Sequence, residues 1–327
     1  MVAVGQDFSH PGLGPKRWSR RQWIGGAGLA GLAGAGFYLY QQRPSFWRDY
    51  ARDLRRPIPP PPAVPHPERW PDRGLYAAWL GHTTVLLKID GFTILTDPIF
   101  SDRAGIGLGL LTLGPKRLVA PALNIRRLPP LDLLLLSHAH MDHMDVPSLR
   151  KLESRATAVV LARHNSDLIR PERYRSVREL GWGETARAGP VSLRAIEVKH
   201  WGSRYRRDTW RGYGGYVLEA GRYRLLFGGD TAITPLFRAL RGSRPFDLAI
   251  LPIGAYNPWI RNHCTPEQAW QIGNEVGAEF LLPVHHQTFA LSREPVMEPI
   301  QRLQEAAGAQ AARIAARRVG EEFGITG

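Results

Sequence analysis

The chain of 327 residues is long enough for one large α/β domain with additional segments, or for two smaller domains. Its single cysteine, Cys264, excludes an intrachain disulfide and therefore the class of disulfide-stabilised scaffolds. A formal net charge of +14 favours anionic partners: a phospholipid surface, a phosphorylated substrate or nucleic acid. Because the arginines are spread along the chain and form no basic tail, nucleic acid is the least favoured of these partners.

The first 45 residues resemble a bacterial twin-arginine export signal. Arg20-Arg21 precedes an apolar, glycine-rich segment from Ile24 to Tyr40, which suits a signal core and is short for a spanning helix. No clear small-x-small cleavage site follows, so we expect a signal that can stay attached as an anchor. The predicted location is the bacterial periplasm or the periplasmic face of the inner membrane. The alternatives are a disordered basic leader, and a cytoplasmic, membrane-associated protein.

Residues 46–74 are predicted to be a basic and proline-rich linker. Arginines and aromatic residues dominate its first part, which either lies on an anionic membrane surface or forms a solvated connector. Further on, Pro59–Pro62 indicates a stiff polyproline spacer without a core of its own. We therefore expect one globular domain over residues 75–327.

This domain begins with three predicted strands, at 76–80, 84–89 and 92–96, and Asp90-Gly91 is a typical hairpin turn between the last two. His82 interrupts the strands, and Asp97 ends the third. Asp97 is a candidate to hold a neighbouring site by hydrogen bonds. His82 either lines the same pocket or is a hydrogen-bonded strand histidine. The Gly- and Leu-rich residues 100–113 are expected to form a loop that flanks a site.

The most informative stretch joins an apolar run, Leu131–Leu136, to the polar sequence Ser137–His143. The run predicts a short buried strand, which gives rigid support to side chains that must converge on one point. His138 and His140 can reach one ion, while Asp142 and His143 can serve a second. Imidazole suits zinc or iron, and a carboxylate suits either. The alternative is a solvated polar loop.

Three later strands also end in ligand-type residues. The predicted strand 191–198 leads to His200, the strand 223–227 to Asp230, and the strand 280–284 to His285 and His286. Because α/β proteins build sites from residues at one edge of their sheets, we expect these side chains to meet the His138 loop. A helix is predicted from Thr265 to about 276, and a tail helix from Pro299 to about 317.

This set of residues is similar to that of the metallo-β-lactamase superfamily, whose fold is a four-layer αββα sandwich with metals at one edge of the two sheets. Several stretches more narrowly resemble the N-acylphosphatidylethanolamine-hydrolysing phospholipase D family: residues 79–85, 95–101, 114–117, 252–256 and 288–291. The resemblance covers residues 76–323, and it makes 75–327 the hydrolase domain.

The resemblance implies two zinc ions, with other divalent metals as alternatives. It places His138, His140 and His200 on one ion, Asp142, His143 and His285 on the other, and Asp230 between them. It also places His263 at the reacting phosphate. Two positions depart from the family pattern: Met141 replaces a frequent aromatic residue, and His286 competes with His285 as a ligand. Tyr256 is a further candidate for the outer shell of hydrogen bonds or the substrate pocket.

The resemblance implies hydrolysis of a phosphodiester by a hydroxide held between the metals, which Asp142 orients and whose reaction His263 assists. The expected substrate is a phospholipid of the N-acylphosphatidylethanolamine type, met at an anionic membrane surface, and a homo-oligomer is compatible with the sequence. One alternative is a lactonase, or a phosphodiesterase acting on sugar phosphates or nucleotides. A second is a non-catalytic envelope protein that binds its ligand without cleaving it.

Overall fold

The computed structural model describes residues 44–326 except 110 and 206. Its contacts divide the chain into two compact units, Met1–Arg56 and Pro57–Gly327. The described part of the first unit is helix α2, Pro44–Arg55, with Arg52 and Arg55 in its last turn. The expected twin-arginine signal falls almost entirely outside the described residues. Within the described ranges, each helix is too short or too polar to span a bilayer.

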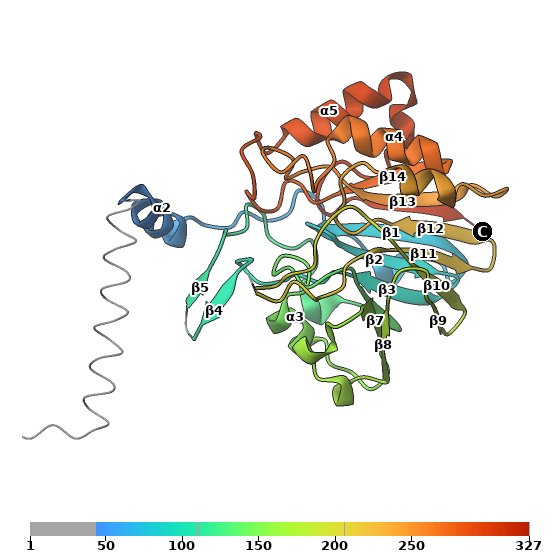
Figure 1. Cartoon of the computed structure of the whole chain (residues 1–327), viewed down its shortest axis with the longest axis horizontal. Coiled ribbons are helices and arrows are strands. Elements are labelled where there is room, and N and C mark those ends of the chain that lie inside the picture. Colours follow the sequence, from blue (N-terminus) through green and yellow to red (C-terminus); the bar gives the residue numbers. More distant parts are fainter. Residues whose placement is uncertain (1–43, 110, 206, 327) are drawn as a thin grey trace, which may run out of the picture. The chain divides into compact units, whose positions relative to one another are not determined.

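Two β-sheets form the frame of the second unit (Figure 1). The strands of the first sheet are, in spatial order, β15 (Glu322–Thr326), β1 (Gly74–Gly81), β2 (Thr84–Ile89), β3 (Phe92–Thr96), β6 (Leu133–Leu136), β7 (Ala158–Ala162) and β8 (Ser176–Leu180). The strands from β3 to β8 run parallel to one another. Every residue of β6 is buried, as a parallel strand covered on both faces requires.

The second sheet follows the order β14 (Ala278–Val284), β13 (Phe246–Pro252), β12 (Tyr223–Phe227), β11 (Gly215–Ala220), β10 (Val191–Ile196) and β9 (Thr185–Ala188). Strands β12 to β14 are parallel and almost fully buried. Strands β9 to β11 are antiparallel. Along β10, buried and exposed residues alternate at first, which is typical of a sheet with one solvated face.

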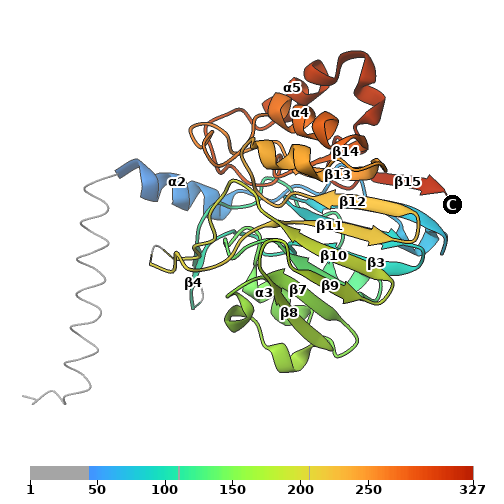
Figure 2. The same ribbon diagram turned by 45° about the vertical axis from the view of Figure 1, so that its right-hand side comes forward.

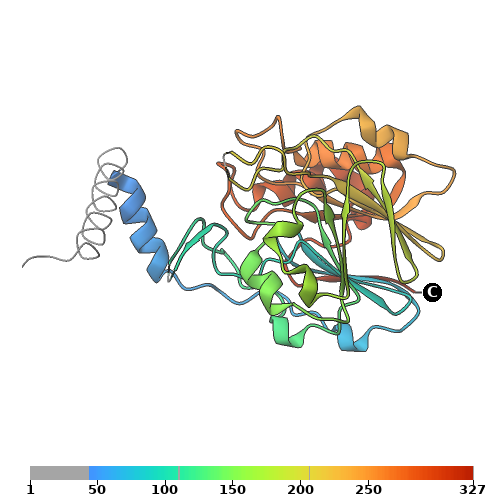
Figure 3. The same cartoon turned by 60° about the horizontal axis from the view of Figure 1, so that its bottom comes forward.

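The sheets lie face to face and share one core, to which the first contributes Trp79 and Leu134 and the second Leu225 and Leu282 (Figure 2). Helices α4 (Pro266–Val276) and α5 (Glu298–Ala307) cover the outer face of the second sheet and share a separate apolar cluster with it. Helix α3 (Val146–Lys151) lies on the other outer side (Figure 3). This arrangement is the predicted αββα sandwich.

Short 3₁₀ turns complete the layers: η1 (Pro67–Arg69), η2 (Ile125–Arg127), η3 (Ser166–Leu168), η4 (Pro171–Arg173), η5 (Pro235–Leu240) and η6 (Gly308–Arg313). Helix α4 begins at Thr265 with a capping box to Gln268 and ends at Gly277, whose φ is 75°, as the sequence predicts. The tail helix stops at Ala307, ten residues earlier than expected, because Gly308 adopts a φ of 50° and η6 follows.

Several segments differ from expectation. Strands β8, β9 and β15 were not predicted, since their polar faces carry no continuous apolar run. The proline-rich stretch that follows Arg56 belongs to the larger unit. There the Ala63 N–H donates to Val319 O over 3.3 Å, and the Ala120 N–H donates to Pro59 O over 2.9 Å. Residues 57–73 therefore pack on the domain and do not form a free spacer. The expected loop at 100–113 contains a hairpin of β4 (Ile106–Leu108) and β5 (Leu111–Leu113).

Candidate metal centre

The ends of four strands deliver the predicted ligands to one place. β6 leads into the loop with His138 to His143, β12 into Asp230, and β14 into His285, while His200 follows β10. Four overlapping groups of ligand atoms result, and the two largest contain four residues each. Within each group, the atoms lie no more than 4.8 Å apart.

The first group consists of His138, His140, His200 and Asp230. The His140 Nδ1 atom lies 2.8 Å from Nε2 of His138 and 3.3 Å from Nε2 of His200. All four side chains are buried or nearly so. Three imidazole nitrogens and one carboxylate oxygen, converging within a few ångströms, match the donor set of a four-coordinate transition-metal ion.

The second group consists of His82, Asp142, His143 and His285. The Asp142 Oδ2 atom lies 2.9 Å from Nε2 of His82, 3.4 Å from Nε2 of His285 and 3.5 Å from Nε2 of His143. His82 and His285 adopt positive φ angles of 54° and 63°. Strained backbone of this kind is common at functional sites. The sequence placed His82 in the wall of the pocket or within a strand. In the structure it is one of the residues whose side chains could hold an ion.

Asp230 connects the two groups through a single oxygen atom. Its Oδ2 lies 3.1 Å from Nε2 of both His143 and His285, 3.7 Å from Nε2 of His200 and 4.0 Å from Nε2 of His138. One carboxylate oxygen therefore faces both groups. The structure gives Asp230 the position that a bridging ligand of two neighbouring ions would need.

Asp97 fixes one histidine in each group. Asp97 Oδ2 accepts hydrogen bonds from His143 Nδ1–H over 2.7 Å and from Ser137 Oγ–H over 2.5 Å. Because the hydroxyl hydrogen of Ser137 is already used in the hydrogen bond to Asp97, its Oγ atom accepts a hydrogen bond from His138 Nδ1–H over 2.8 Å. Both imidazoles are thereby held in the tautomer that leaves Nε2 free for an ion. His200 is held in the same way, since its Nδ1–H donates to Asn262 O over 3.0 Å.

Burial shapes the titration of the cluster. It lowers the pKa of His82 to about 3 and those of His140 and His263 to about 4. Burial also lowers the pKa values of His138 and His200 well below the ordinary range. These imidazoles are consequently neutral near pH 7, which is the form that binds a metal ion.

The two carboxylates act in the opposite direction on the remaining histidines. Burial opposes the charged form of His285, but Asp230 and Asp142 outweigh it and raise the pKa to about 9. The same carboxylates raise the pKa of His143 well above its usual value. Burial would likewise raise the pKa values of both aspartates, but His143 holds them well below the usual range. Without a metal ion, the two carboxylates therefore favour a proton on each of these histidines, and a bound cation would replace those protons.

Several buried polar atoms in this cluster have no hydrogen-bond partner among the described residues: Nε2 of His143, Nε2 of His285, Oδ1 of Asp230 and Nδ1 of His263. Leaving buried polar atoms unpaired is costly, so their accumulation in one place is typical of a site that binds an ion. Divalent cations satisfy lone pairs of nitrogen and oxygen together. The donors present fit a binuclear metal site.

A pocket of about 350 Å³ opens beside the cluster. Its lining combines polar residues of the ligand groups with the apolar side chains of Met141, Trp201, Trp259 and Leu291. His263 is buried, lines the pocket and places Nδ1 3.8 Å from Asp230 Oδ2. Met141 and His263 therefore both line the pocket that opens beside the ligand groups.

Two candidates lie elsewhere. The Tyr256 hydroxyl donates to Glu298 Oε1 over 2.6 Å and so points toward α5, which corrects the expectation that this residue surrounds the site. His286 is buried with its ring stacked on Trp79 at a centroid distance of 4.4 Å, outside both ligand groups. Its neighbour His285, whose φ is 63°, belongs to the second group instead.

Sequence reasoning missed three residues of the pocket, Trp201, Trp259 and Arg204. Arg204 donates through Nη1 to Ala139 O over 2.9 Å and to Met144 O over 2.8 Å, and so holds both ends of the ligand loop. Trp201 directly follows the predicted ligand His200 in the sequence, and this position could have identified it as a residue of the pocket. Arg204 gave none, since its partners are backbone oxygens of a distant segment.

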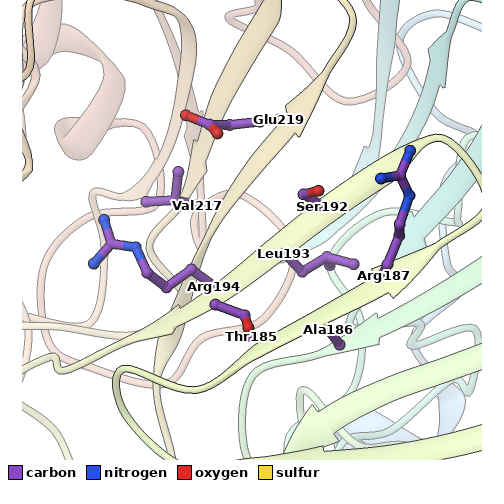
Figure 4. Close-up of a pocket in the computed structure, with 8 residues that line it drawn as sticks. All are labelled: Thr185, Ala186, Arg187, Ser192, Leu193, Arg194, Val217 and Glu219. Atoms are coloured by element: carbon purple, nitrogen blue, oxygen red, sulfur yellow. The ribbon is translucent and has the colours of Figure 1, made fainter.

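A second depression, of about 490 Å³, lies on the outer face of β9, β10 and β11 (Figure 4). Its polar members project side by side from two cross-strand rows, Thr185–Arg194–Val217 and Arg187–Ser192–Glu219. The charged side chains are exposed, and Glu219 pairs with Arg224 over 3.2 Å. Such a surface is typical of the solvated face of a sheet, and it is separate from the metal centre.

Comparisons with known proteins identify relatives of the whole domain. The family model described as "Beta-lactamase superfamily domain" matches residues 93–286. An uncharacterised protein of Mycobacterium tuberculosis is 33% identical over 294 residues, which cover 86% of this chain and 77% of that protein. The N-acyl-phosphatidylethanolamine-hydrolyzing phospholipase D 1 of Caenorhabditis elegans is 30% identical over 252 residues, which cover 72% of this chain and 70% of that protein.

The mitochondrial N-acyl-phosphatidylethanolamine-hydrolyzing phospholipase D of Saccharomyces cerevisiae is 31% identical over 245 residues, which cover 70% of this chain and 51% of that protein. Among solved structures, the isothiocyanate hydrolase from Delia radicum gut bacteria has a TM-score of 0.61 at 15% identity, covering 77% of this chain and all of that one. A possible metal-dependent hydrolase from Veillonella parvula has a TM-score of 0.60 at 16% identity, and the match covers 77% of this chain and 99% of that one. These structures show that the fold is shared.

Proposed function

The chain belongs to the metallo-β-lactamase superfamily and is a metal-dependent hydrolase of that fold, and from this premise we propose that it cleaves the phosphodiester of an N-acylphosphatidylethanolamine-type phospholipid with the help of two zinc ions. The observation that carries the proposal is the pocket beside the metal centre, which combines polar and apolar lining. Residues of the ligand groups line it together with Trp201, Trp259 and Leu291.

An amphipathic diester suits such a pocket. The charged phosphoryl group would lie at the ligand groups, where the cations bind, and an acyl chain would lie along the apolar side chains. Both tryptophans are partly exposed, Trp201 by 39% and Trp259 by 50%, so a substrate chain would remove apolar surface from water. The relatives from C. elegans and S. cerevisiae, named as N-acylphosphatidylethanolamine hydrolases, support the same substrate class.

The proposal takes zinc as the metal because this donor set suits it. The site offers imidazole nitrogens and carboxylate oxygens, and it has no thiolate because Cys264 lies buried away from the ligand groups. Bound zinc ions would lower the pKa of a water to supply the nucleophile, and they would offset negative charge on the phosphoryl oxygens. The protein side chains supply the remaining steps.

Asp142 orients the attacking water. It is a carboxylate at neutral pH, since His143 holds its pKa low, and an ionised carboxylate can only accept hydrogen bonds. Its side chain is 17% exposed and lines the pocket, so one oxygen remains available to a water while Oδ2 is held by His82. The accepted hydrogen bond directs a lone pair of the water toward the phosphorus atom.

His263 acts on the phosphoryl group from the pocket side. Burial lowers its pKa to about 4, so its imidazole is neutral and carries one N–H near pH 7. That N–H can donate to a non-bridging oxygen and stabilise the charge that develops there. A substrate chain bound against the apolar side chains of the pocket would exclude bulk water, which would strengthen each of these interactions.

The surface charge and the expected export signal support a location at a membrane. A net charge of +14 attracts the enzyme to anionic phospholipids, and a twin-arginine signal would place it on the periplasmic side of the inner membrane. Folded, metal-loaded protein is the form that this export route carries. The membrane location and the export route are both part of the proposed function.

The test compares the lipids of one bacterial membrane extract after incubation with zinc-loaded wild type and with Asp142→Asn. The proposal predicts that N-acylphosphatidylethanolamines disappear, with release of phosphatidic acid, only with wild type. A parallel panel of bis-p-nitrophenyl phosphate, homoserine lactones and cyclic nucleotides separates the alternative hydrolases. Lactone turnover without lipid turnover would overturn the proposal. Substoichiometric metal, with no turnover in any assay, would point to a binding protein.

A further inference from the structure

A cluster of three charged side chains, Arg211, Asp167 and Asp208, lies outside the ligand groups of the metal centre. Arg211 is buried and uses all three nitrogens of its guanidinium. It donates through Nη1 and Nη2 to the two oxygens of Asp167, over 2.7 and 2.8 Å, and through Nε to Asp208 Oδ2 over 2.6 Å. Paired hydrogen bonds between a guanidinium and a carboxylate are strong and set the geometry of both groups. This Arg211 cluster therefore holds the arginine in one orientation.

The cluster joins segments that are far apart in the sequence. Asp167 belongs to η3, and Arg211 also donates through Nη1 to His164 O over 2.8 Å. On the other side, Asp208 Oδ1 accepts from the Tyr205 N–H over 2.6 Å. The hydrogen bonds from Arg211 lower the pKa of Asp167 below its usual range, so this pair is charged at neutral pH. The stretch that follows β7 is thereby tied to residues 205–211.

The segment of residues 201–212 closes on itself at a narrow neck. A Cβ atom added at Gly202 would lie 2.2 Å from Arg211 O, and one added at Gly212 would lie 2.6 Å from Arg163 O. The Gly212 N–H donates to Arg163 O over 2.8 Å. Backbones approach this closely only where a glycine stands. The place of Arg211 therefore fixes the backbone at Gly202, which directly follows Trp201.

Two side chains of the same segment reach the metal centre. The Trp201 ring centre lies 4.3 Å from that of His200 and 4.6 Å from that of His140. Arg204 donates to backbone oxygens at both ends of the ligand loop. Trp201 and Arg204 both line the pocket beside the ligand groups. The segment thus supplies part of the lining that a substrate would contact.

We propose that the Arg211 cluster positions this part of the lining, with Trp201 at its centre, and thereby sets how tightly the pocket holds its substrate. The inference rests on the proposed function for the substrate, whose acyl chain Trp201 would contact. Arg211, Asp167 and Asp208 do not line the pocket, so they are positioning residues. A side chain that is fixed before the substrate arrives loses little entropy on binding, and this favours affinity.

The test weakens the cluster with Asp167→Asn, which removes the charge and one of the two acceptor oxygens. The KM for a short-chain N-acylphosphatidylethanolamine should rise about fivefold while kcat stays within about twofold, because binding is lost and the chemical step is not. Zinc content should equal that of wild type. An unchanged KM, or a fall in kcat at constant KM, would overturn the proposal.

A matched control separates positioning from a general loss of stability. Arg302 on α5 donates through Nε and Nη2 to the two oxygens of Glu267 on α4, both over 2.8 Å. This pair has the same forked geometry, and neither residue lines the pocket. Glu267→Gln should therefore leave KM near wild type. An equal rise of KM in Glu267→Gln and Asp167→Asn would contradict a specific role of the Arg211 cluster.

A double-mutant cycle shows whether the cluster acts through Trp201. Trp201→Ala removes the ring and should raise KM by itself. When Asp167→Asn is added to Trp201→Ala, KM should not rise further, because the side chain that the cluster positions is already gone. Changes in KM that multiply fully would contradict the proposal, since residues that act independently are additive in free energy.

Fluorine NMR of the full, zinc-loaded chain with 5-fluorotryptophan gives a result without turnover. Trp201→Phe identifies the resonance of Trp201. That resonance should shift or broaden in Asp167→Asn, or in Arg211→Lys if the first variant does not fold, and it should stay unchanged in Glu267→Gln. An unchanged Trp201 resonance in the cluster variants would overturn the proposal. Absence of lipid turnover in wild type would instead contradict the proposed function and leave this result intact.

Discussion

The metal centre and the depression on the outer face of β9 to β11 are both built from polar side chains on strands, yet they differ in what those side chains can do. At the metal centre, the ligands follow the ends of strands. The loops there turn them together, so that the ligand atoms of each group lie within 4.8 Å of one another. On the outer face, Arg187, Arg194 and Glu219 lie within strands and project side by side into solvent (Figure 4).

The difference teaches that position along a strand decides whether polar residues become a site. Within a sheet, the pleat separates neighbouring side chains and points them the same way, so each is solvated by itself. Beyond the strand end, positive φ angles at His82, Asp97 and His285 fold the chain back over a common centre. Burial there leaves polar atoms unpaired, and only a ligand can satisfy them.

Removing charge at the bridging position should have the largest effect. Asp230→Asn keeps the size of the side chain but weakens its hold on both ligand groups, so we expect at least about a thousandfold loss of hydrolysis and a loss of bound metal. Turnover and metal analysis measure the two effects. Glu219→Gln makes the same chemical change on the outer face and should leave both near wild type. Full activity in Asp230→Asn would contradict its bridging position.

Metal removal should affect stability as well as activity. Ions that bind only the folded state at a hundredfold or more above Kd contribute about 2.7 kcal/mol or more, so chelation should lower Tm by roughly 5–10 °C. Differential scanning fluorimetry with and without a chelator, followed by zinc addition, checks this. A variant of the outer face, Arg194→Ala, should show the same chelator-dependent drop. An unchanged Tm would mean that the ligand groups are stable without metal.

The hydrogen bonds of Asp97 should have an intermediate effect. Asp97→Asn replaces one acceptor oxygen by an N–H₂ group, so His143, Ser137 and the His138 ring linked through Ser137 lose their fixed orientation. Outer hydrogen bonds of this type contribute about 10–100-fold to metal affinity. Zinc competition with a fluorescent chelator gives the apparent Kd. Unaltered affinity would show that the tautomers are set in another way.

The smallest effects are expected on the outer face. Arg187→Ala should change the free energy of unfolding by no more than about 0.5 kcal/mol, because exposed charges contribute little. Chemical denaturation and hydrolysis of a soluble diester measure the result. A large loss of activity in this variant would give the outer depression a role that its solvated geometry does not suggest.

The sequence predicted the parts of the fold that carry a strong apolar signal. The predicted strand at 84–89 is β2, and the apolar run at 131–136 contains β6; the continuous hydrophobicity of both reflects cover on both faces. Strands β8 and β15 alternate polar and half-buried residues at sheet edges, so no such run marks them. The hairpin of β4 and β5 was not predicted because its glycines are typical of loops.

The ligand positions could be predicted because each residue follows a strand end, a local feature of the sequence. The arrangement around them could not. The approach of Asp97 to His143, and the reach of Arg204 to the ligand loop, depend on contacts between distant segments. The hydroxyl of Tyr256 was misplaced for the same reason, since Glu298, its partner, lies on a helix 42 residues further along the chain.

The most direct test of the account is a titration of metal-free protein with zinc, followed by hydrolysis of an N-acylphosphatidylethanolamine in mixed vesicles. Two ligand groups that share Asp230 predict that activity reaches its maximum at two zinc ions per chain, and that Asp230→Asn stays inactive throughout. Maximal activity at one ion per chain, or hydrolysis without any added metal, would contradict the central claim.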